Sequence, residues 1–186
     1  MCYTVVHTYA KVTRYNEFGH LIQTIQNTTE GQKLYCKPFY ITENRNEDII
    51  VSDLHLNAVV VTDREGRHRF SYKGHPSGFE PGNICTDELS HILVCDCWTR
   101  TVQMLDKDGG FLTLIPIDQK GIKIPESVVY DSKSHLLWVG IKNSNEVFVY
   151  RYYIRGQQAN LEEGCDKQEN PKDNNISTWW SEEEYI

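Results

Sequence analysis

Long apolar runs are absent from this sequence of 186 residues. No stretch approaches the roughly 18 apolar residues of a membrane-spanning helix, so we expect no membrane partner. The first residues, from Met1 to His7, lack the basic region, apolar core and small-residue cleavage site of a secretory signal peptide. The six cysteines follow no regular spacing, and the chain is too long to be a small disulfide scaffold. These absences predict a cytoplasmic protein with reduced cysteines.

An excess of positive charge is also lacking, because the formal net charge is -7. Residues 1–155 hold 17 basic and 18 acidic side chains, a net charge of -1, whereas residues 156–186 hold two lysines and eight acids, a net charge of -6. The main body of the chain is therefore nearly neutral and has no strongly basic nucleic-acid footprint. This lowers the expectation of an RNA partner without removing it, since a neutral domain can carry a local basic patch.

The sequence does contain an internal repeat. Pairs of landmark residues recur at an offset of 43 positions: Pro38 and Pro81, Asp53 and Asp96, Asp63 and Asp106, and Gly66 and Gly109. A third copy begins at Pro125 with an offset of 44 or 45 residues, and an incomplete copy precedes the others at residues 10–25. A period near 43 residues is typical of the blades of a β-propeller.

Each complete copy predicts four short strands rich in Val, Ile, Tyr and Phe. In the first complete copy these strands lie near residues 39–42, 48–52, 58–63 and 67–72. The segment from Asp63 to Gly66 has the form of a hairpin turn, in which the Asp accepts from turn amides and the Gly supplies a positive φ. No stretch shows a sustained helical periodicity, so the sequence predicts an all-β fold.

The length of the repeat region predicts an incomplete ring. The 151 residues from Tyr3 to Tyr153 hold about three and a half units, whereas closed propellers have about 4 to 8 blades. We therefore predict a partial β-propeller over residues 1–154, with an open edge at each end through which two copies of the chain could associate. Residues 155–186 are polar and acidic, and we predict a disordered tail there.

Several phrases of the repeat match those of a known family. They include Asp48-Ile49-Ile50-Val51-Ser52-Asp53, His91-Ile92-Leu93-Val94-Cys95-Asp96 and Leu136-Leu137-Trp138-Val139-Gly140. With these phrases, the segment from Pro38 to Tyr153 resembles the NHL-repeat propeller of tripartite-motif proteins, most of all the set found in molluscs. The resemblance implies about three and a half four-stranded blades of NHL type, roughly half of the six that the family leads us to expect.

The same resemblance implies a function. In that family the propeller recruits substrates to a ubiquitin ligase, or in some members binds RNA. This sequence carries no RING, B-box or coiled coil before the repeats. We therefore predict a non-catalytic protein-binding module, not an enzyme, whose partner is a ubiquitination substrate or a ligase complex. An RNA-binding surface is the alternative.

Binding on a propeller usually takes place at loops, and the loops between second and third strands share one face with the links between blades. On this face Trp98 and Arg100 are of the types that are common at binding hot spots. An aromatic beside basic residues can also stack on an unpaired base, and the other interpretation of Trp98 is packing over the blade edge. The full predicted set is His55, Asn57, Lys73, His75, Trp98, Arg100, Lys120, Lys123, Lys142, Asn143 and Asn145.

Asp53 and Asp96 are the best catalytic candidates, because some propeller hydrolases hold a divalent ion with carboxylates near the axis. A metal site needs several converging oxygens, and the third copy has Gly140 or Ile141 at this position. We therefore expect each carboxylate to accept hydrogen bonds from amides of the loop that it begins. A metal-dependent hydrolase is the least favoured alternative.

Other motifs for chemistry are sparse. Cys95-Asp96-Cys97 is not the paired C-x2-C of a structural zinc site, and no His stands at a recognised spacing from a Cys. Cys36 and Cys85 are predicted to be small buried apolar residues. His91 and His135, which each precede a second strand, are predicted to serve in turns. We expect no cofactor and no bound metal.

Overall fold

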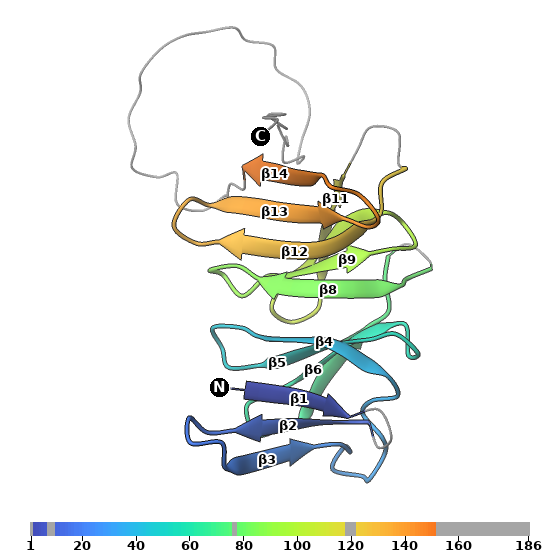
Figure 1. Ribbon diagram of the computed structural model, residues 1–186. Helices are drawn as coiled ribbons and strands as arrows, with labels where there is room; N and C mark the ends of the chain where they lie inside the picture. The colour runs from blue at the N-terminus through green and yellow to red at the C-terminus, as the bar shows by residue number, and fades with distance from the viewer. Residues whose placement is uncertain (1, 7–9, 76–77, 118–121, 152–186) are drawn as a thin grey trace, which may run out of the picture.

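The fold is all-β, as the sequence predicts. The computed structural model describes residues 2–6, 10–75, 78–117 and 122–151. These residues form fourteen strands arranged in four antiparallel sheets (Figure 1). Over the same residues, no helix is long and apolar enough to cross a membrane. The predicted disordered tail, residues 155–186, and the predicted boundary at residue 154 lie outside the described residues.

Two sheets are complete four-stranded blades, which we call blade 2 and blade 3. In each, the strands lie side by side in sequence order. Blade 2 consists of β4 (Pro38–Glu43), β5 (Ile49–Asp53), β6 (Ala58–Thr62) and β7 (His68–Tyr72). Blade 3 consists of β8 (Pro81–Thr86), β9 (Ile92–Asp96), β10 (Thr101–Leu105) and β11 (Phe111–Pro116).

The two terminal sheets have three strands each. Blade 1 consists of β1 (Cys2–Val6), β2 (Lys11–Tyr15) and β3 (Leu21–Ile25), and blade 4 of β12 (Pro125–Asp131), β13 (Leu136–Ile141) and β14 (Val147–Arg151). The turn from β2 to β3 repeats the backbone hydrogen bonds of the β6–β7 turn, so blade 1 lacks a first strand. Pro125 pairs with Ile141 as Pro38 pairs with Asp53, so the three described strands of blade 4 are its first, second and third. Fourteen strands amount to three and a half blades, which confirms the prediction.

Hairpin turns between third and fourth strands follow the predicted chemistry. Asp63 accepts a hydrogen bond at 2.8 Å from the amide of Arg67, and Gly66 donates at 2.9 Å to the carbonyl of Asp63. Gly109, the counterpart of Gly66, has a φ of 90°, and a Cβ atom there would lie 2.6 Å from the ring of Phe70. Glycine is therefore required both by the backbone conformation and by the approach of the neighbouring blade.

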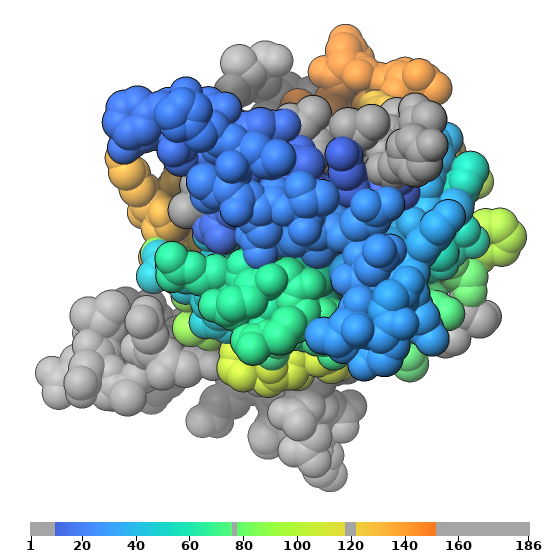
Figure 2. All heavy atoms as spheres, turned by 90° about the horizontal axis from the view of Figure 1, so that it is seen from below, coloured from blue at the N-terminus to red at the C-terminus, as the bar shows by residue number. Residues whose placement is uncertain are grey.

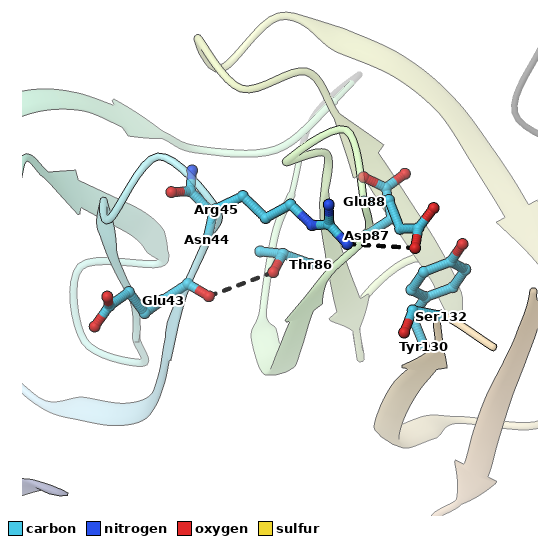
Figure 3. Close-up of a pocket in the computed structure, with 8 residues that line it drawn as sticks. All are labelled: Glu43, Asn44, Arg45, Thr86, Asp87, Glu88, Tyr130 and Ser132. Atoms are coloured by element: carbon cyan, nitrogen blue, oxygen red, sulfur yellow. Dashed lines mark hydrogen bonds and ion pairs between the residues drawn. The ribbon is translucent and has the colours of Figure 1, made fainter. Parts of the chain in front are cut away.

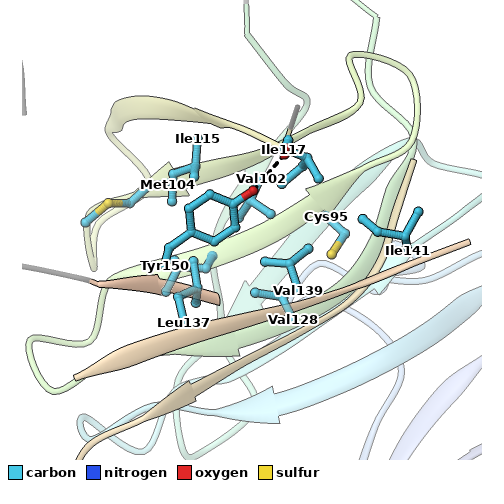
Figure 4. Close-up of a cluster of buried hydrophobic side chains, with 11 residues drawn as sticks. Cys95, Val102, Met104, Ile115, Ile117, Val128, Leu137, Val139, Ile141 and Tyr150 are labelled. Atoms are coloured by element: carbon cyan, nitrogen blue, oxygen red, sulfur yellow. Dashed lines mark hydrogen bonds between the residues drawn. The ribbon is translucent and has the colours of Figure 1, made fainter. Parts of the chain in front are cut away.

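The core lies between the blades. Ile49 and Val51 of β5 pack in the cluster that joins blade 2 to blade 1, whereas Ile50 packs in the cluster that joins blade 2 to blade 3. A second strand buried on both faces explains the continuous apolar runs in the sequence. A third cluster joins blade 3 to blade 4, where the hydroxyl of Tyr150 donates at 2.8 Å to the carbonyl of Ile117 (Figure 4).

The blades form an open arc. Among the first strands of the blades, β8 contacts both β4 and β12. Blade 1 and blade 4 lie at its opposite ends (Figure 1). Seen from the N-terminal side, blade 1 lies across blade 2 and closes that end of the molecule (Figure 2). Each end blade therefore has one broad side with no neighbouring blade among the described residues.

Candidate functional site

The loops between second and third strands gather with the blade links at one end of the sheets, here called the loop end. Backbone hydrogen bonds of 2.9–3.1 Å tie each such loop to the link that precedes the same blade. They run from Leu54 to Lys37, from Cys97 to Glu80 and from Lys142 to Ile124. This confirms that the loops and the links share one face.

Asp53 organises the loop end of blade 2. Its side chain is fully buried and accepts from four backbone amides. Two belong to the preceding link, Cys36 at 2.7 Å and Lys37 at 2.9 Å, and two to the following loop, His55 at 3.1 Å and Leu56 at 3.0 Å. A buried carboxylate is stable when charge-assisted hydrogen bonds surround it. Asp53 therefore has the structural role that the sequence predicts.

Asp96 does the same in blade 3 and also binds side chains. It accepts from the amides of Glu80 and Trp98, both at 3.0 Å, from the hydroxyl of Thr99 at 2.6 Å and from the amide group of Gln103 at 2.7 Å. In blade 4 the equivalent position is Ile141. No third carboxylate joins the pair, and no three His, Cys, Asp or Glu side chains in the described ranges are placed to hold a metal ion.

Trp98 is the most exposed aromatic side chain at the loop end, with 67% of its surface accessible. Its indole lies against Gly78 of the link before blade 3, where a Cβ atom would collide with the ring. Trp98 thus packs on a link and still presents a broad apolar surface. Phe39, Leu56 and Ile122 are further exposed apolar side chains in the loops, links or strand starts at this end.

The other predicted binding residues divide into two groups. Lys73, His55, Lys142 and Asn145 are exposed, as expected of loop residues that meet a partner. In contrast, Lys123 forms an ion pair with Glu146 at 2.8 Å and lies over the ring of Phe148. Some of the basic charge that we predicted for this face is therefore neutralised within blade 4.

Three predicted residues shape the loops themselves. Asn57, Arg100 and Asn143 have positive φ angles of 46°, 59° and 55°. Asn adopts this conformation more easily than most residues, so the two asparagines have a clear conformational role. His75 is exposed, and its ring stacks on Phe111 with centroids 4.2 Å apart. Lys120 lies outside the described residues.

The cysteine predictions hold only in part. Cys95 is fully buried. Cys85 is partly buried and packs against the same cluster, where burial raises the pKa of its thiol to about 12. Cys36, however, is exposed, and its Sγ lies 3.8 Å from Nδ1 of His55. The prediction of a buried Cys36 is wrong because the residue lies in the link before β4 and not in the strand. The amides that Asp53 binds bring the two side chains together, although 19 positions separate them.

A pocket of about 310 Å³ that the sequence did not predict lies at the opposite end of the sheets. The turns between first and second strands of blades 2, 3 and 4 surround it (Figure 3). Arg45 and Glu88 form an ion pair of 3.3 Å there. Burial raises the pKa of Tyr130, and the negative charges of Glu88 and Asp87 raise it further. The pocket is lined by Glu43, Asn44, Arg45, Thr86, Asp87, Glu88, Tyr130 and Ser132.

The repeat contains a sequence pattern that marks the turns around this pocket. Asn44 and Asp87 stand at the same position, and each accepts from amides two and four residues further on. His91 also binds the carboxylate of Asp87, with Nδ1 at 2.7 Å. His135 has a φ of 55° and contacts the hydroxyl of Tyr130 at 2.7 Å. These bonds confirm the predicted turn role of the two histidines.

Solved structures with this architecture are β-propellers. The chain matches virginiamycin B lyase from Staphylococcus aureus with a TM-score of 0.61 and 17% identity, over 80% of this chain and 51% of that one. It matches a streptogramin B lyase with a TM-score of 0.62 and 16% identity, over 79% and 46%. It matches a gluconolactonase-like protein with a TM-score of 0.57 and 16% identity, over 75% and 44%. No protein-family model and no curated protein matches the sequence.

These likenesses show the propeller fold alone. The chain spans about half the length of the structures it matches. They support a propeller and do not single out the NHL-repeat type or the tripartite-motif family.

The same comparisons overturn the prediction that this chain is not an enzyme. Two of the three similar propellers are lyases, and the third is gluconolactonase-like. The prediction rested on the absence of a RING, which concerns a single activity. Loops at the ends of rigid sheets can hold catalytic groups as readily as a binding partner, so the fold does not separate the two.

Proposed function

We propose that this chain binds a protein partner at its loop end. The observation that carries the proposal is Trp98, whose indole is 67% exposed. Its backbone amide donates a hydrogen bond to Asp96, and its ring packs on Gly78. A rigid, exposed aromatic loses little conformational freedom when a partner covers it. Exposed Leu56 and Ile122 supply further apolar surface at the same end.

The class of partner follows from the resemblance of the repeat to tripartite-motif NHL propellers. In that family, the propeller recruits the substrate of a ubiquitin ligase. A ubiquitination substrate or a ligase complex is therefore the partner that we propose. The nearly neutral body of the chain and the ion pair of Lys123 with Glu146 favour a protein over RNA.

The test compares two alanine variants of the full chain, each lacking one large exposed side chain, as baits in affinity capture from cells. Trp98→Ala removes the proposed anchor, whereas Leu112→Ala removes an apolar side chain of β11 that is 46% exposed and lies away from the loops. We expect Trp98→Ala to weaken binding of a direct partner about 30-fold, which corresponds to ~2 kcal/mol. Leu112→Ala should leave the same partner bound.

Treatment with ribonuclease and titration with salt separate the two kinds of partner. A protein contact should survive ribonuclease and depend only weakly on salt. Capture that disappears with ribonuclease, together with a steep loss of affinity in added salt, would support the RNA alternative. Equal capture by the wild type and Trp98→Ala would contradict the proposed site.

A further inference from the structure

We propose that two copies of this chain associate through the uncovered side of blade 4, face to face about a twofold axis parallel to β13. This inference does not depend on the proposed function, because the surface involved is not the loop end. The inference follows from the strand register of blade 4 and from the opposite charges of Asp131 and Arg151 on its uncovered side. It also follows from the more polar composition of the outer side of blade 1.

The uncovered side of blade 4 has the pattern of a side that packs against another blade. Register places Val129, Trp138 and Val149 in one row across the three strands, and Ser127, Gly140 and Val147 in the next row. Trp138 stands where blade 3 has Leu93, which is fully buried against blade 4. Yet Val129 and Val147 are each 58% exposed and Trp138 is 39% exposed. This apolar face therefore resembles one half of a blade–blade interface.

The sequence after β14 differs from the turn sequence that leads to a fourth strand in blades 2 and 3. Tyr150 pairs with Leu137 as Thr62 pairs with Ile49, so Arg151 stands at the position of Asp63. Ile154 then stands at the position of the turn glycine Gly66. The aspartate that accepts from turn amides and the glycine with a positive φ are both replaced.

Blade 1 is not a suitable partner for this face. On the side of blade 1 that has no neighbour, Lys11 stands at the position of Ala58, and Thr13 at that of Val60. Ala58 and Val60 are buried between blades 1 and 2. Thr13 is already buried in the single chain, whereas Lys11 is partly exposed. A head-to-tail ring of two chains would bury Lys11 against Trp138, at the cost of removing an ammonium group from water. Polar outer sides of this kind are typical of terminal capping repeats.

The uncovered side of blade 4 is complementary to itself. The third row of side-chain positions runs from Asp131 on β12 through Leu136 to Arg151 on β14. A twofold axis along β13 places β12 of one copy over β14 of the other, so each Asp131 meets the Arg151 of the second copy. The two Trp138 side chains meet at the centre, and strand directions stay aligned, as in common sheet-on-sheet packing.

The small size of the face predicts a weak dimer. It offers nine side-chain positions in three rows, whereas a standard interface takes about 20–30 residues from each partner. We therefore expect a dissociation constant on the order of 10 µM or weaker. Sedimentation velocity of the full chain between about 1 and 200 µM covers this range.

The test uses charge exchange, which keeps the complementarity while reversing its direction. Asp131→Arg and Arg151→Asp should each weaken the dimer, and the double variant should restore it. Trp138→Glu should abolish the dimer within the same concentration range, whereas Lys11→Glu on blade 1 should leave it unchanged. Circular dichroism of each variant checks that the sheets still form, since Asp131 also binds the amide of Lys133.

A monomer at every concentration would overturn the proposal. This includes a monomer in which residues 152–186 cover Trp138. A dimer that survives Trp138→Glu would overturn it as well. Loss of the dimer in Lys11→Glu would instead indicate a ring closed through blade 1. Failure of the double charge exchange to restore a dimer that both single exchanges weaken would contradict the proposed axis.

Discussion

Replacing Asp53 with alanine will lower the free energy of unfolding by about 3 kcal/mol or more. Four backbone amides, of Cys36, Lys37, His55 and Leu56, lose their acceptor in this variant. Each buried polar group left without a partner costs about 1–3 kcal/mol. Amides of exposed loop residues can recover part of that free energy by hydrogen bonding to water. Urea denaturation followed by circular dichroism measures the change.

Two variants separate the hydrogen bonds of Asp53 from the loss of any carboxylate. Asp53→Asn keeps one side-chain oxygen as an acceptor and should be less damaging than Asp53→Ala. Asp106→Ala removes a carboxylate that accepts from the amides of Asp108 and Gly110 in an exposed turn. It should cost about 1 kcal/mol, because water can replace the lost acceptor there. Equal effects of Asp53→Ala and Asp106→Ala would contradict the role of Asp53 in joining the link to the loop at the loop end.

Replacing Gln103 with leucine will lower the free energy of unfolding by about 2–4 kcal/mol. Gln103 is fully buried. Its amide group donates to Asp96 at 2.7 Å, and its oxygen accepts from the hydroxyl of Tyr72 and from the amide of His75. Leucine has a similar volume but leaves these groups, from blade 2, the link and blade 3, without a partner.

Gln23→Leu is the matched control for this variant. Gln23 donates to the carbonyl of Arg64 in an exposed setting, and its replacement should change the free energy of unfolding by less than about 0.5 kcal/mol. If Gln103→Leu is as mild as Gln23→Leu, the buried network does not hold blades 2 and 3 together.

The Gln103 network also predicts how stability depends on pH. Burial, followed by the charge of Asp96, raises the pKa of Tyr72 from its ordinary value of 10.0 to about 12. The neutral hydroxyl is therefore favoured in the folded state, where it donates to Gln103. Its contribution to stability is fully present below pH 10 and is lost as the pH rises through about 12.

The repeat made the architecture predictable. The landmarks Pro38, Pro81 and Pro125 begin the first strands of blades 2, 3 and 4, and the turn pair of Asp63 and Gly66 marks the hairpin that follows a third strand. These positions depend on local backbone chemistry, which a single sequence shows directly. The sequence also predicted that Asp53 and Asp96 would bind loop amides, because each one begins a loop that needs acceptors.

Features that depend on contacts between distant segments were not predictable. The approach of Cys36 to His55 arises from bonds to Asp53 and follows no spacing rule. The polar pocket beside Arg45 needs three blades at a defined curvature, which the repeat period does not specify. Whether a propeller of this shape catalyses a reaction depends on side chains in its loops, so the absence of a RING was no basis for excluding an enzyme.

In this structure, buried carboxylates hold the loop end rigid around Trp98. Amide hydrogen exchange, measured residue by residue, tests it directly. We expect the amides of Lys37, Leu56 and Trp98 to exchange at least about 100-fold more slowly than in an unstructured peptide, although they lie outside the strands, and Asp53→Asn to accelerate the first two. Exchange of these amides at the unstructured rate, while β5 and β9 stay protected, would contradict the account.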